Sequence, residues 1–257
     1  MTANKNNNNH FQYLNTMGIT VWVRRPPFSS LAESTPSVNE TFTAHSLPVE
    51  IVTSSQSNHS QPDHQPLLPS QLDWQTLQQQ VSACTACPLH QNRTQPVFGV
   101  GNCQADWMLI GEAPGAEEDA QGEPFVGRAG QLLNAMLYAI ELRREEVYIA
   151  NIVKCRPPKN RNPTLEEAAS CNSFLQQQIT IIKPKLIIAL GRIAAQHLLV
   201  TAEPIGQLRG RCLEYAHFGI PLIATYHPAY LLRRPTEKRR AWQDLQLIVQ
   251  QMTRLKS

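Results

Sequence analysis

Four of the six cysteines fall into a pattern that suits metal binding. Cys84 and Cys87 form a Cys-x-x-Cys pair, and Cys155 and Cys171 occur later in the chain. One such pair supplies only two thiolates, so a closed site needs two more, which Cys155 and Cys171 can provide. Zinc and an iron–sulfur cluster both accept four thiolates, and buried thiols without metal are the remaining alternative.

A second stretch that could do chemistry is residues 109–128, where an apolar run ends and a loop rich in glycine, proline and carboxylates begins. Ligands of open α/β sheets bind beyond the carboxyl ends of the strands, so acids and an aromatic side chain there are well placed. Gly111 and Gly115 would let the backbone approach a ligand, and Pro114 would stiffen the turn. A solvated acidic loop is the alternative.

Composition limits the class of protein. The net charge of +3 over 257 residues is only mildly basic, so nucleic-acid binding would require clustered charge. We see no apolar run long enough to span a bilayer and no apolar core of a signal peptide. We therefore expect a cytoplasmic protein, in which patterned cysteines bind metal more often than they form disulfides. We also expect the protein to be a monomer.

The chain divides near residue 70. Residues 1–70 are polar and rich in proline without an apolar period, so we expect a largely disordered tail. One apolar island at residues 11–26 interrupts it, and is either a docking peptide or a segment packed on the main domain. The folded domain is expected at residues 71–257.

Strand and helix signals alternate along the folded domain. Buried strands are expected at residues 107–110, 147–153, 186–190 and 222–225, with a connecting loop at 99–102. Helices are expected at residues 72–81, 130–140, 191–199 and 238–252, and another after Thr164, whose spacing to Glu167 matches a capping box. This alternation predicts an α/β fold in which helices cover both faces of a mostly parallel, four-stranded sheet.

Five motifs in register resemble those of the family 4 uracil-DNA glycosylases. They are Cys-x-x-Cys-Pro-Leu at 84–89, Gly-Glu-Ala-Pro-Gly-x-x-Glu-Asp at 111–119, Pro-Phe-Val-Gly-Arg-Ala-Gly at 124–130, Asn-Ile-Val-Lys-Cys-Arg-Pro-Pro at 151–158 and Tyr-His-Pro-Ala-Tyr at 226–230. The resemblance spans nearly all of residues 75–255. It implies a three-layer α/β/α fold, excision of uracil from DNA to leave an abasic site, and a [4Fe–4S] cluster on Cys84, Cys87, Cys155 and Cys171.

The resemblance also implies roles for single residues. Asn151 would read the Watson–Crick edge of a flipped uracil, and Phe125 would stack on the base. His227 would donate to uracil O2 as negative charge develops there. Glu112 is the first candidate for the carboxylate that activates water or faces the sugar, and Glu118 is the second.

One motif differs from that of the larger classical uracil-DNA glycosylases. By the resemblance, those enzymes carry Asp-Pro-Tyr at the positions where this chain has Ala113, Pro114 and Gly115. The acid is displaced by one position, so its role cannot be copied. The tyrosine that screens out the methyl group of thymine is also absent. We expect another group to do this, with Glu118 as the candidate.

Two basic clusters are candidates for contacts to DNA phosphates, although a solvated helix face is the alternative for the second. They comprise Lys154, Arg156, Lys159 and Arg161, and then Arg233, Arg234, Lys238, Arg239 and Arg240. The wedge that fills the gap left by a flipped base is expected among Tyr230, Leu231 and Leu232.

Two rival functions and one partner follow. The rivals are a non-catalytic module that binds damaged or single-stranded DNA, and a related glycosylase for other deaminated bases such as hypoxanthine; Asn151 favours uracil. Residues 14–22, Leu-Asn-Thr-Met-Gly-Ile-Thr-Val-Trp, followed by Arg-Arg-Pro at 24–26, resemble the N-terminal segment of the psi subunit of the bacterial DNA polymerase III clamp loader. That resemblance implies docking of residues 11–26 on the chi subunit.

Overall fold

The computed structural model describes residues 73–256 of the chain. The tail predicted at residues 1–70, with its apolar island at 11–26, lies outside the described residues. Within residues 73–256, none of the helices is long and apolar enough to cross a membrane.

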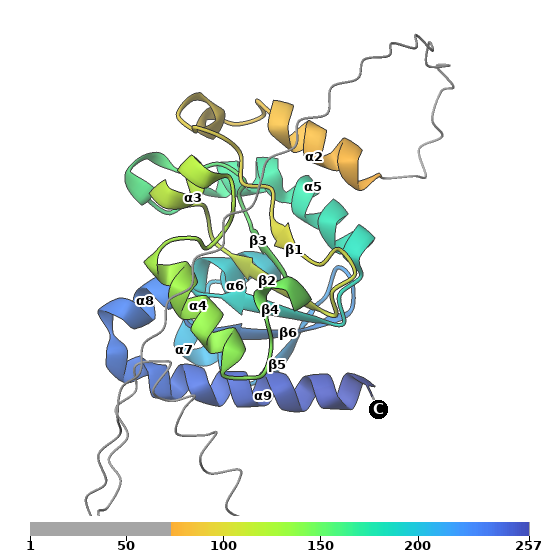
Figure 1. The fold of residues 1–257 in the computed structure, drawn as a ribbon, viewed down its shortest axis with the longest axis vertical. Helices are drawn as coiled ribbons and strands as arrows, with labels where there is room; N and C mark the ends of the chain where they lie inside the picture. The colour runs from red at the N-terminus through yellow and green to blue at the C-terminus, as the bar shows by residue number, and fades with distance from the viewer. Residues whose placement is uncertain (1–72, 257) are drawn as a thin grey trace, which may run out of the picture. The chain divides into compact units, whose positions relative to one another are not determined.

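The described residues contain a six-stranded sheet in the order β1-β3-β2-β4-β6-β5 (Figure 1). Strands β3, β2, β4 and β6 run parallel to one another, whereas β1 and β5 lie antiparallel at the two edges. The strands are β1 (Val100–Gly101), β2 (Trp107–Gly111), β3 (Tyr148–Asn151), β4 (Leu186–Leu190), β5 (Cys212–Tyr215) and β6 (Ile220–Thr225).

The four parallel strands confirm the predicted core of the sheet, and the two edge strands are additions to it. The segment 99–102, expected to be a loop, contains β1. Two residues are too few to show an alternating pattern, and β5 shows only one buried residue, Tyr215, so neither gave a clear signal.

Helices cover both faces of the sheet. They are α2 (Trp74–Ala83), α3 (Ala116–Gln121), α4 (Arg128–Tyr138), α5 (Leu165–Ile182), α6 (Arg192–Leu199), α7 (Ile205–Leu208), α8 (Pro228–Arg233) and α9 (Lys238–Lys256). Short 3₁₀ turns lie at Pro88–Gln91, Arg144–Glu146, Pro158–Asn160 and Pro235–Glu237. The helices expected from the sequence are present, whereas α3, α7 and α8 were too short to predict.

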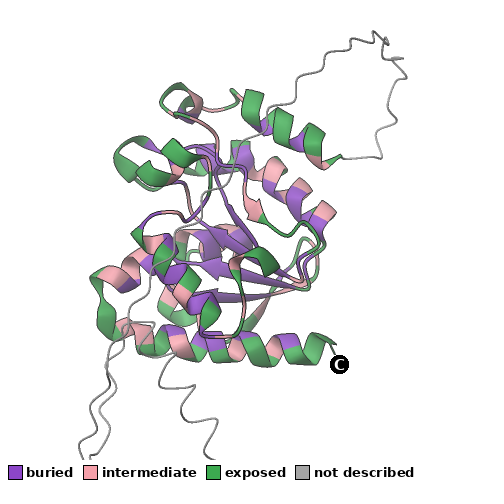
Figure 2. Ribbon diagram, in the orientation of Figure 1, coloured by how far each residue is buried: buried purple, intermediate pink, exposed green. Residues whose placement is uncertain are grey.

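Alternate residues of each central strand enter two separate cores. Leu109 and Ile149 pack with α4, α8 and α9, whereas Met108 and Ile110 pack with α5, α6 and α7. Strands β2, β3 and β4 are buried along their length, and β6 is buried over its last four residues (Figure 2). This confirms the predicted three layers, because a sheet buried on both faces requires helices on each.

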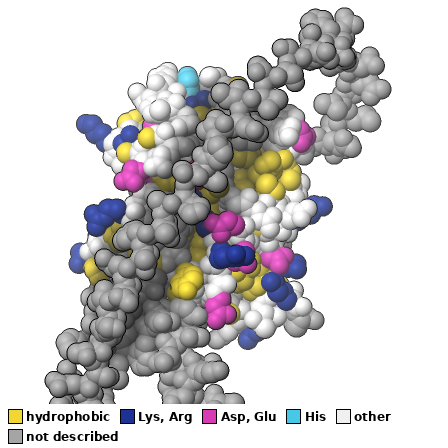
Figure 3. Space-filling view, in the orientation of Figure 1, with side chains coloured by type: hydrophobic (Ala, Val, Ile, Leu, Met, Phe, Trp, Pro, Cys, Tyr) yellow, Lys and Arg dark blue, Asp and Glu magenta, His cyan; other side chains and the backbone are white. Residues whose placement is uncertain are grey.

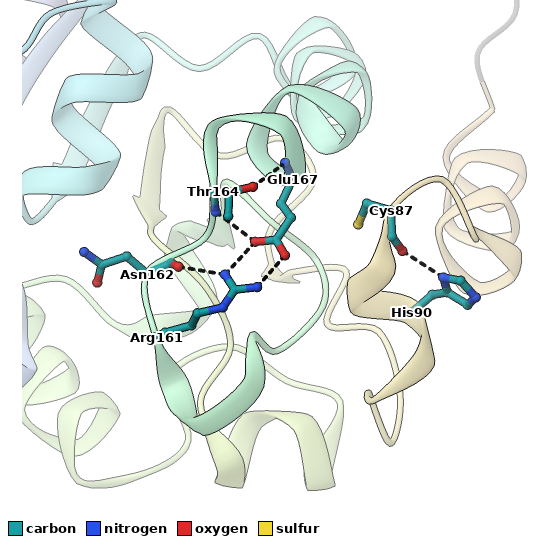
Figure 4. A network of polar contacts seen from close by, with 6 residues as sticks. All are labelled: Cys87, His90, Arg161, Asn162, Thr164 and Glu167. Carbon is teal, nitrogen blue, oxygen red and sulfur yellow. Dashed lines mark hydrogen bonds and ion pairs between the residues drawn. The ribbon is translucent and has the colours of Figure 1, made fainter.

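The start of α5 is fixed by a reciprocal cap. Thr164 Oγ1 accepts from the Glu167 main-chain N at 3.2 Å, and Glu167 Oε2 accepts from the Thr164 main-chain N at 2.8 Å. Arg161 donates to both carboxylate oxygens of Glu167, at 2.8 and 2.6 Å (Figure 4). The predicted capping box is therefore confirmed, and it also anchors the loop that precedes the helix.

A substitution at Val200, at the end of α6, is expected to stabilise the folded domain. Its φ of 50° is left-handed, a conformation that costs an L-residue about 1–2 kcal/mol, and its side chain is 92% exposed. Val200→Gly should raise the free energy of unfolding in urea by about 1 kcal/mol. The matched control, Val249→Gly inside α9, should lower it by about 0.5–1 kcal/mol. Equal effects of the two changes would contradict this explanation.

Candidate active site

The carboxyl ends of the four parallel strands meet at one edge of the sheet. Gly111 pairs with Asn151 between β2 and β3, and Leu190 pairs with Thr225 between β4 and β6. The segments that follow these strands line a cleft of about 560 Å³. The cleft brings together these residues predicted from the sequence: Glu112, Ala113, Gly115, Glu118, Phe125, Asn151, Arg161, His227, Tyr230 and Arg233.

Phe125 and Asn151 pack directly against the backbone of Gly111. A Cβ atom at Gly111 would lie 2.4 Å from Asn151 Oδ1 and 2.7 Å from Phe125 Cζ. The Phe125 ring lies 5.5 Å from the His227 ring, centroid to centroid. Glycine at the end of β2 is therefore what allows the ring and the amide to share the cleft.

The amide of Asn151 has an unused acceptor. Asn151 is 2% exposed, and its Oδ1 is the only buried side-chain nitrogen or oxygen atom within residues 73–256 that has no hydrogen-bond partner. An unsatisfied buried acceptor costs about 1–3 kcal/mol. Since Asn151 lines the cleft, a ligand with a suitably placed N–H or O–H would satisfy it.

His227 is held as a neutral hydrogen-bond donor. Its Nδ1 accepts from the main-chain N of Ala229 at 3.1 Å, at the start of α8. The pKa of His227 is lowered to about 4, chiefly by burial and in smaller part by the charge of Arg233, while the charge of Glu118 opposes the shift. At neutral pH the imidazole is therefore uncharged, with its proton on Nε2.

Glu112, the residue after β2, is half-buried beside two residues that the sequence did not predict. Burial raises the pKa of Glu112, while the charge of Arg192 opposes the shift. With its amide nitrogen facing Glu112, Asn162 donates to Glu112 Oε1 at 3.0 Å and accepts from Arg192 Nη2 at 3.3 Å. Arg192 opens α6 just beyond β4, a position that the strand-end rule could have identified; Asn162 carried no sequence signal.

Glu118 uses its carboxylate to tie two segments of backbone together. Its Oε2 accepts from the main-chain N of Gly115 at 3.1 Å, and its Oε1 accepts from Val126 and Gly127 at 3.0 and 3.1 Å. These bonds join the start of α3 to the segment after Phe125. The contacts are those of a residue that positions the cleft wall.

The four patterned cysteines line a second cavity. Cys155 Sγ accepts from Arg93 Nη1 at 3.0 Å, and Cys171 Sγ accepts from the main-chain N of Lys154 at 3.3 Å. Burial raises the pKa of both thiols. Within residues 73–256, no three His, Cys, Asp or Glu side chains lie close enough together to hold a single metal ion.

Two residues predicted to contact DNA are buried, and those predictions are wrong. Lys154 is 1% exposed: its Nζ donates to the Asn151 carbonyl at 3.0 Å and to Gln178 Oε1 at 2.6 Å, and burial lowers its pKa to about 8. Leu231 is also 1% exposed and packs in the core beneath α8. Lys154 lies in a run of five buried residues, 151–155.

The other candidates for DNA contact reach the surface. Arg161, Arg233 and Arg234 are exposed, and Arg156 is half-buried with its Nε donating to Asn160 Oδ1 at 2.7 Å. Tyr230 is half-buried and stacks on Tyr226, with ring centroids 5.1 Å apart. On the uncovered part of the face drawn in Figure 3, basic and acidic side chains are interspersed, as the small net charge suggests.

Comparison with known proteins agrees with this arrangement. The family model of the uracil DNA glycosylase superfamily matches residues 98–246, so the chain belongs to that superfamily. It is similar to the Type-4 uracil-DNA glycosylase of Archaeoglobus fulgidus, at 46% identity over 162 residues, which cover 61% of this chain and 81% of the relative. It is also similar to the Type-4 uracil-DNA glycosylase of Thermotoga maritima, at 50% identity over 164 residues, which cover 63% of this chain and 85% of the relative.

The Type-5 relatives are more distant, which places the chain in the type-4 group of the superfamily. The Type-5 uracil-DNA glycosylase of Pyrobaculum aerophilum is 32% identical over 154 residues, or 53% of this chain and 67% of the relative. The predicted family is thereby confirmed.

The packing at Gly111 can be tested by adding one methyl group. Gly111→Ala should lower the free energy of unfolding by about 1–3 kcal/mol, because the new Cβ overlaps both the Asn151 amide and the Phe125 ring. Gly206→Ala is the matched control, since nothing lies within 4 Å of its added Cβ. Urea unfolding measures both, and unchanged stability of Gly111→Ala would show that the close packing is absent.

Proposed function

We propose that the chain excises uracil from DNA by hydrolysing its N-glycosidic bond, leaving free uracil and an abasic site. The observation that carries this is the unsatisfied Oδ1 of Asn151, a residue that lines the same cleft as Phe125, the neutral His227 and Glu112. Membership of the uracil DNA glycosylase superfamily supports the same reaction.

Asn151 supplies recognition of the base. A uracil flipped out of the stack presents N3–H as a donor and O4 as an acceptor. Asn151 Oδ1 would accept from N3–H, and its amide nitrogen would donate to O4. Cytosine presents the opposite pattern, so it would leave the buried Oδ1 unsatisfied, and such a mismatch discriminates strongly between ligands.

His227 supplies stabilisation of the leaving base. As the bond between C1′ and N1 breaks, its electron pair moves onto the base, and negative charge collects on O2. A neutral imidazole whose Nε2 carries the proton can donate a hydrogen bond to that oxygen. The low pKa of His227 and the Ala229 bond to Nδ1 hold the ring in that state.

Glu112 supplies negative charge on the sugar side of the reaction. The sugar becomes oxocarbenium-like as the base leaves, and a water oxygen then bonds to C1′. Glu112 would stabilise the positive sugar or accept the proton of that water. Asn162 fixes the carboxylate, and we propose that Glu118 positions the cleft wall instead of reacting, because its oxygens already accept three main-chain bonds.

Replacing Glu112 tests the reaction. Glu112→Gln keeps the size of the side chain but removes its charge, so uracil release should fall by about 10²–10⁴-fold while DNA binding survives. Glu214→Gln, an exposed change on β5, is the matched control and should release uracil at the normal rate. Single-turnover base release and DNA binding are measured on the same oligonucleotide.

The same assay decides between the proposed reaction and its rivals. Full activity of Glu112→Gln would remove Glu112 from the mechanism. No uracil release by the unaltered chain would favour a DNA-binding module, and faster release of hypoxanthine than of uracil would favour a different glycosylase.

We propose further that Cys84, Cys87, Cys155 and Cys171 hold a [4Fe–4S] cluster. The four thiols line one cavity, and N–H groups of Arg93 and Lys154 already face two of the sulfurs, as second-layer donors do around thiolate ligands. Such a cluster supplies a covalent tie between the segment after α2 and the segment after β3. We therefore assign it a structural role.

Metal analysis tests the cluster. The anaerobically purified chain should contain about four irons and four sulfides, because four thiolates match a cubane cluster. Cys171→Ser should lose iron and folded yield, whereas Cys103→Ser, an exposed cysteine away from the cavity, should keep both. Stoichiometric zinc without iron would overturn the assignment.

The surface arginines around the cleft are proposed to contact DNA phosphates, chiefly Arg156, Arg161, Arg233 and Arg234. Tyr230, at the cleft and half-buried, remains the candidate for the wedge. The docking of residues 11–26 on a clamp-loader chi subunit stays a prediction, because that segment lies outside the described residues.

A further inference from the structure

Phe125 has a backbone conformation that its own residue type does not favour. Its φ is 55°, in the left-handed region that L side chains rarely adopt. Strained residues of this kind persist only where the surrounding structure holds them, and they gather at functional sites. Something other than local preference must therefore keep Phe125 in place.

The two carbonyl groups beside this strained residue are held by one distant side chain. Arg144 Nη1 donates to the Phe125 carbonyl at 3.2 Å, and Arg144 Nη2 donates to the Pro124 carbonyl. Nη1 also donates to Asn134 Oδ1 at 3.3 Å, which ties the guanidinium to α4. Arg144 lies in the turn before β3, so its position is set by the sheet rather than by the Phe125 segment.

Glu118 and α4 also hold this segment. Glu118 accepts from the main-chain N–H groups of Val126 and Gly127. A Cβ atom at Gly130 would lie 1.8 Å from the Phe125 carbonyl oxygen, so α4 packs closely against this carbonyl. Arg144 donates to the carbonyls of residues 124 and 125, and Glu118 accepts from the N–H groups of residues 126 and 127. These contacts together fix the orientation of residues 124–127.

That orientation decides where the aromatic ring lies. The ring sits over Gly111, beside Asn151, and 5.5 Å from the His227 ring. Release of the two carbonyls would let Phe125 relax to an extended or right-handed conformation, which would swing its side chain away from the base. The loss would fall on stacking and leave the polar groups of the cleft in place.

We propose that Arg144 is a positioning residue for base stacking: it holds the Pro124 and Phe125 carbonyls so that the Phe125 ring is presented to the flipped base. This rests on the proposed function, in which Phe125 stacks on uracil. Arginine suits the task because its planar guanidinium donates to two acceptors at once, which the single ammonium of lysine cannot do with the same geometry.

A double-mutant cycle tests the coupling. Uracil release by the unaltered chain, Arg144→Met, Phe125→Ala and the double variant is measured as kcat/KM on one single-stranded oligonucleotide. Each single change should lower kcat/KM by about tenfold or more, the effect of losing a base stack. Arg144→Met in the Phe125→Ala background should cost less than about twofold, because the ring it positions is already gone.

Two controls separate positioning from stability. Arg143→Met, which removes a neighbouring exposed arginine whose Nε pairs with Glu146, should leave kcat/KM unchanged. Arg144→Lys should fall between the unaltered chain and Arg144→Met, and it replaces Arg144→Met in the cycle if the latter does not fold. Titration of active sites with a tight-binding abasic-site analogue corrects each rate for the fraction of folded enzyme.

The outcomes are distinct. A rate loss at Arg144 that is the same with and without Phe125 would show a role independent of the ring and overturn the inference, as would no loss in either background. If the unaltered chain releases no uracil, the proposed function fails first, and that result is visible before any variant is made.

Discussion

The parallel hydrogen bonding of β3, β2, β4 and β6 is the constraint on which the rest of the structure depends. Because these strands point the same way and pair in register, Gly111, Asn151 and Thr225 reach the same edge of the sheet. Residues far apart in the chain, such as Glu112 and His227, thereby meet in one cleft. The helices on both faces bury the strands, and the cleft lies at this edge.

A second theme is the satisfaction of buried polar groups. Arg209 and Thr225 both donate to the fully buried carboxylate of Asp244, which holds the end of β6 just before His227. Lys154 Nζ likewise donates to the Asn151 carbonyl and to Gln178 Oε1. Against this background, Asn151 Oδ1 is the one buried side-chain nitrogen or oxygen of residues 73–256 without a hydrogen-bond partner, in agreement with the proposed role in binding the base.

The two cavities are linked through the segment that follows β3. Asn151 faces the cleft, Lys154 donates to the Asn151 carbonyl and to the Cys171 sulfur, and Cys155 lines the cysteine cavity. The proposed cluster, by tying this segment to Cys84 and Cys87, would stabilise the carboxyl end of β3. The residues proposed for the cluster and for base recognition therefore share a short piece of backbone.

The sequence alone determined the features that depend on residue type and short spacing. Apolar runs predicted the four parallel strands, the Thr164 to Glu167 spacing predicted the start of α5, and the motifs predicted that Glu112, Asn151 and His227 would lie together. Tertiary structure alone decided the direction of long side chains. Lys154 and Leu231 turn inward, Glu118 binds backbone, and Arg144 and Asn162 reach residues distant in sequence. Such contacts depend on which face of a segment packs against the core, and neither charge nor hydrophobicity of a single residue encodes that.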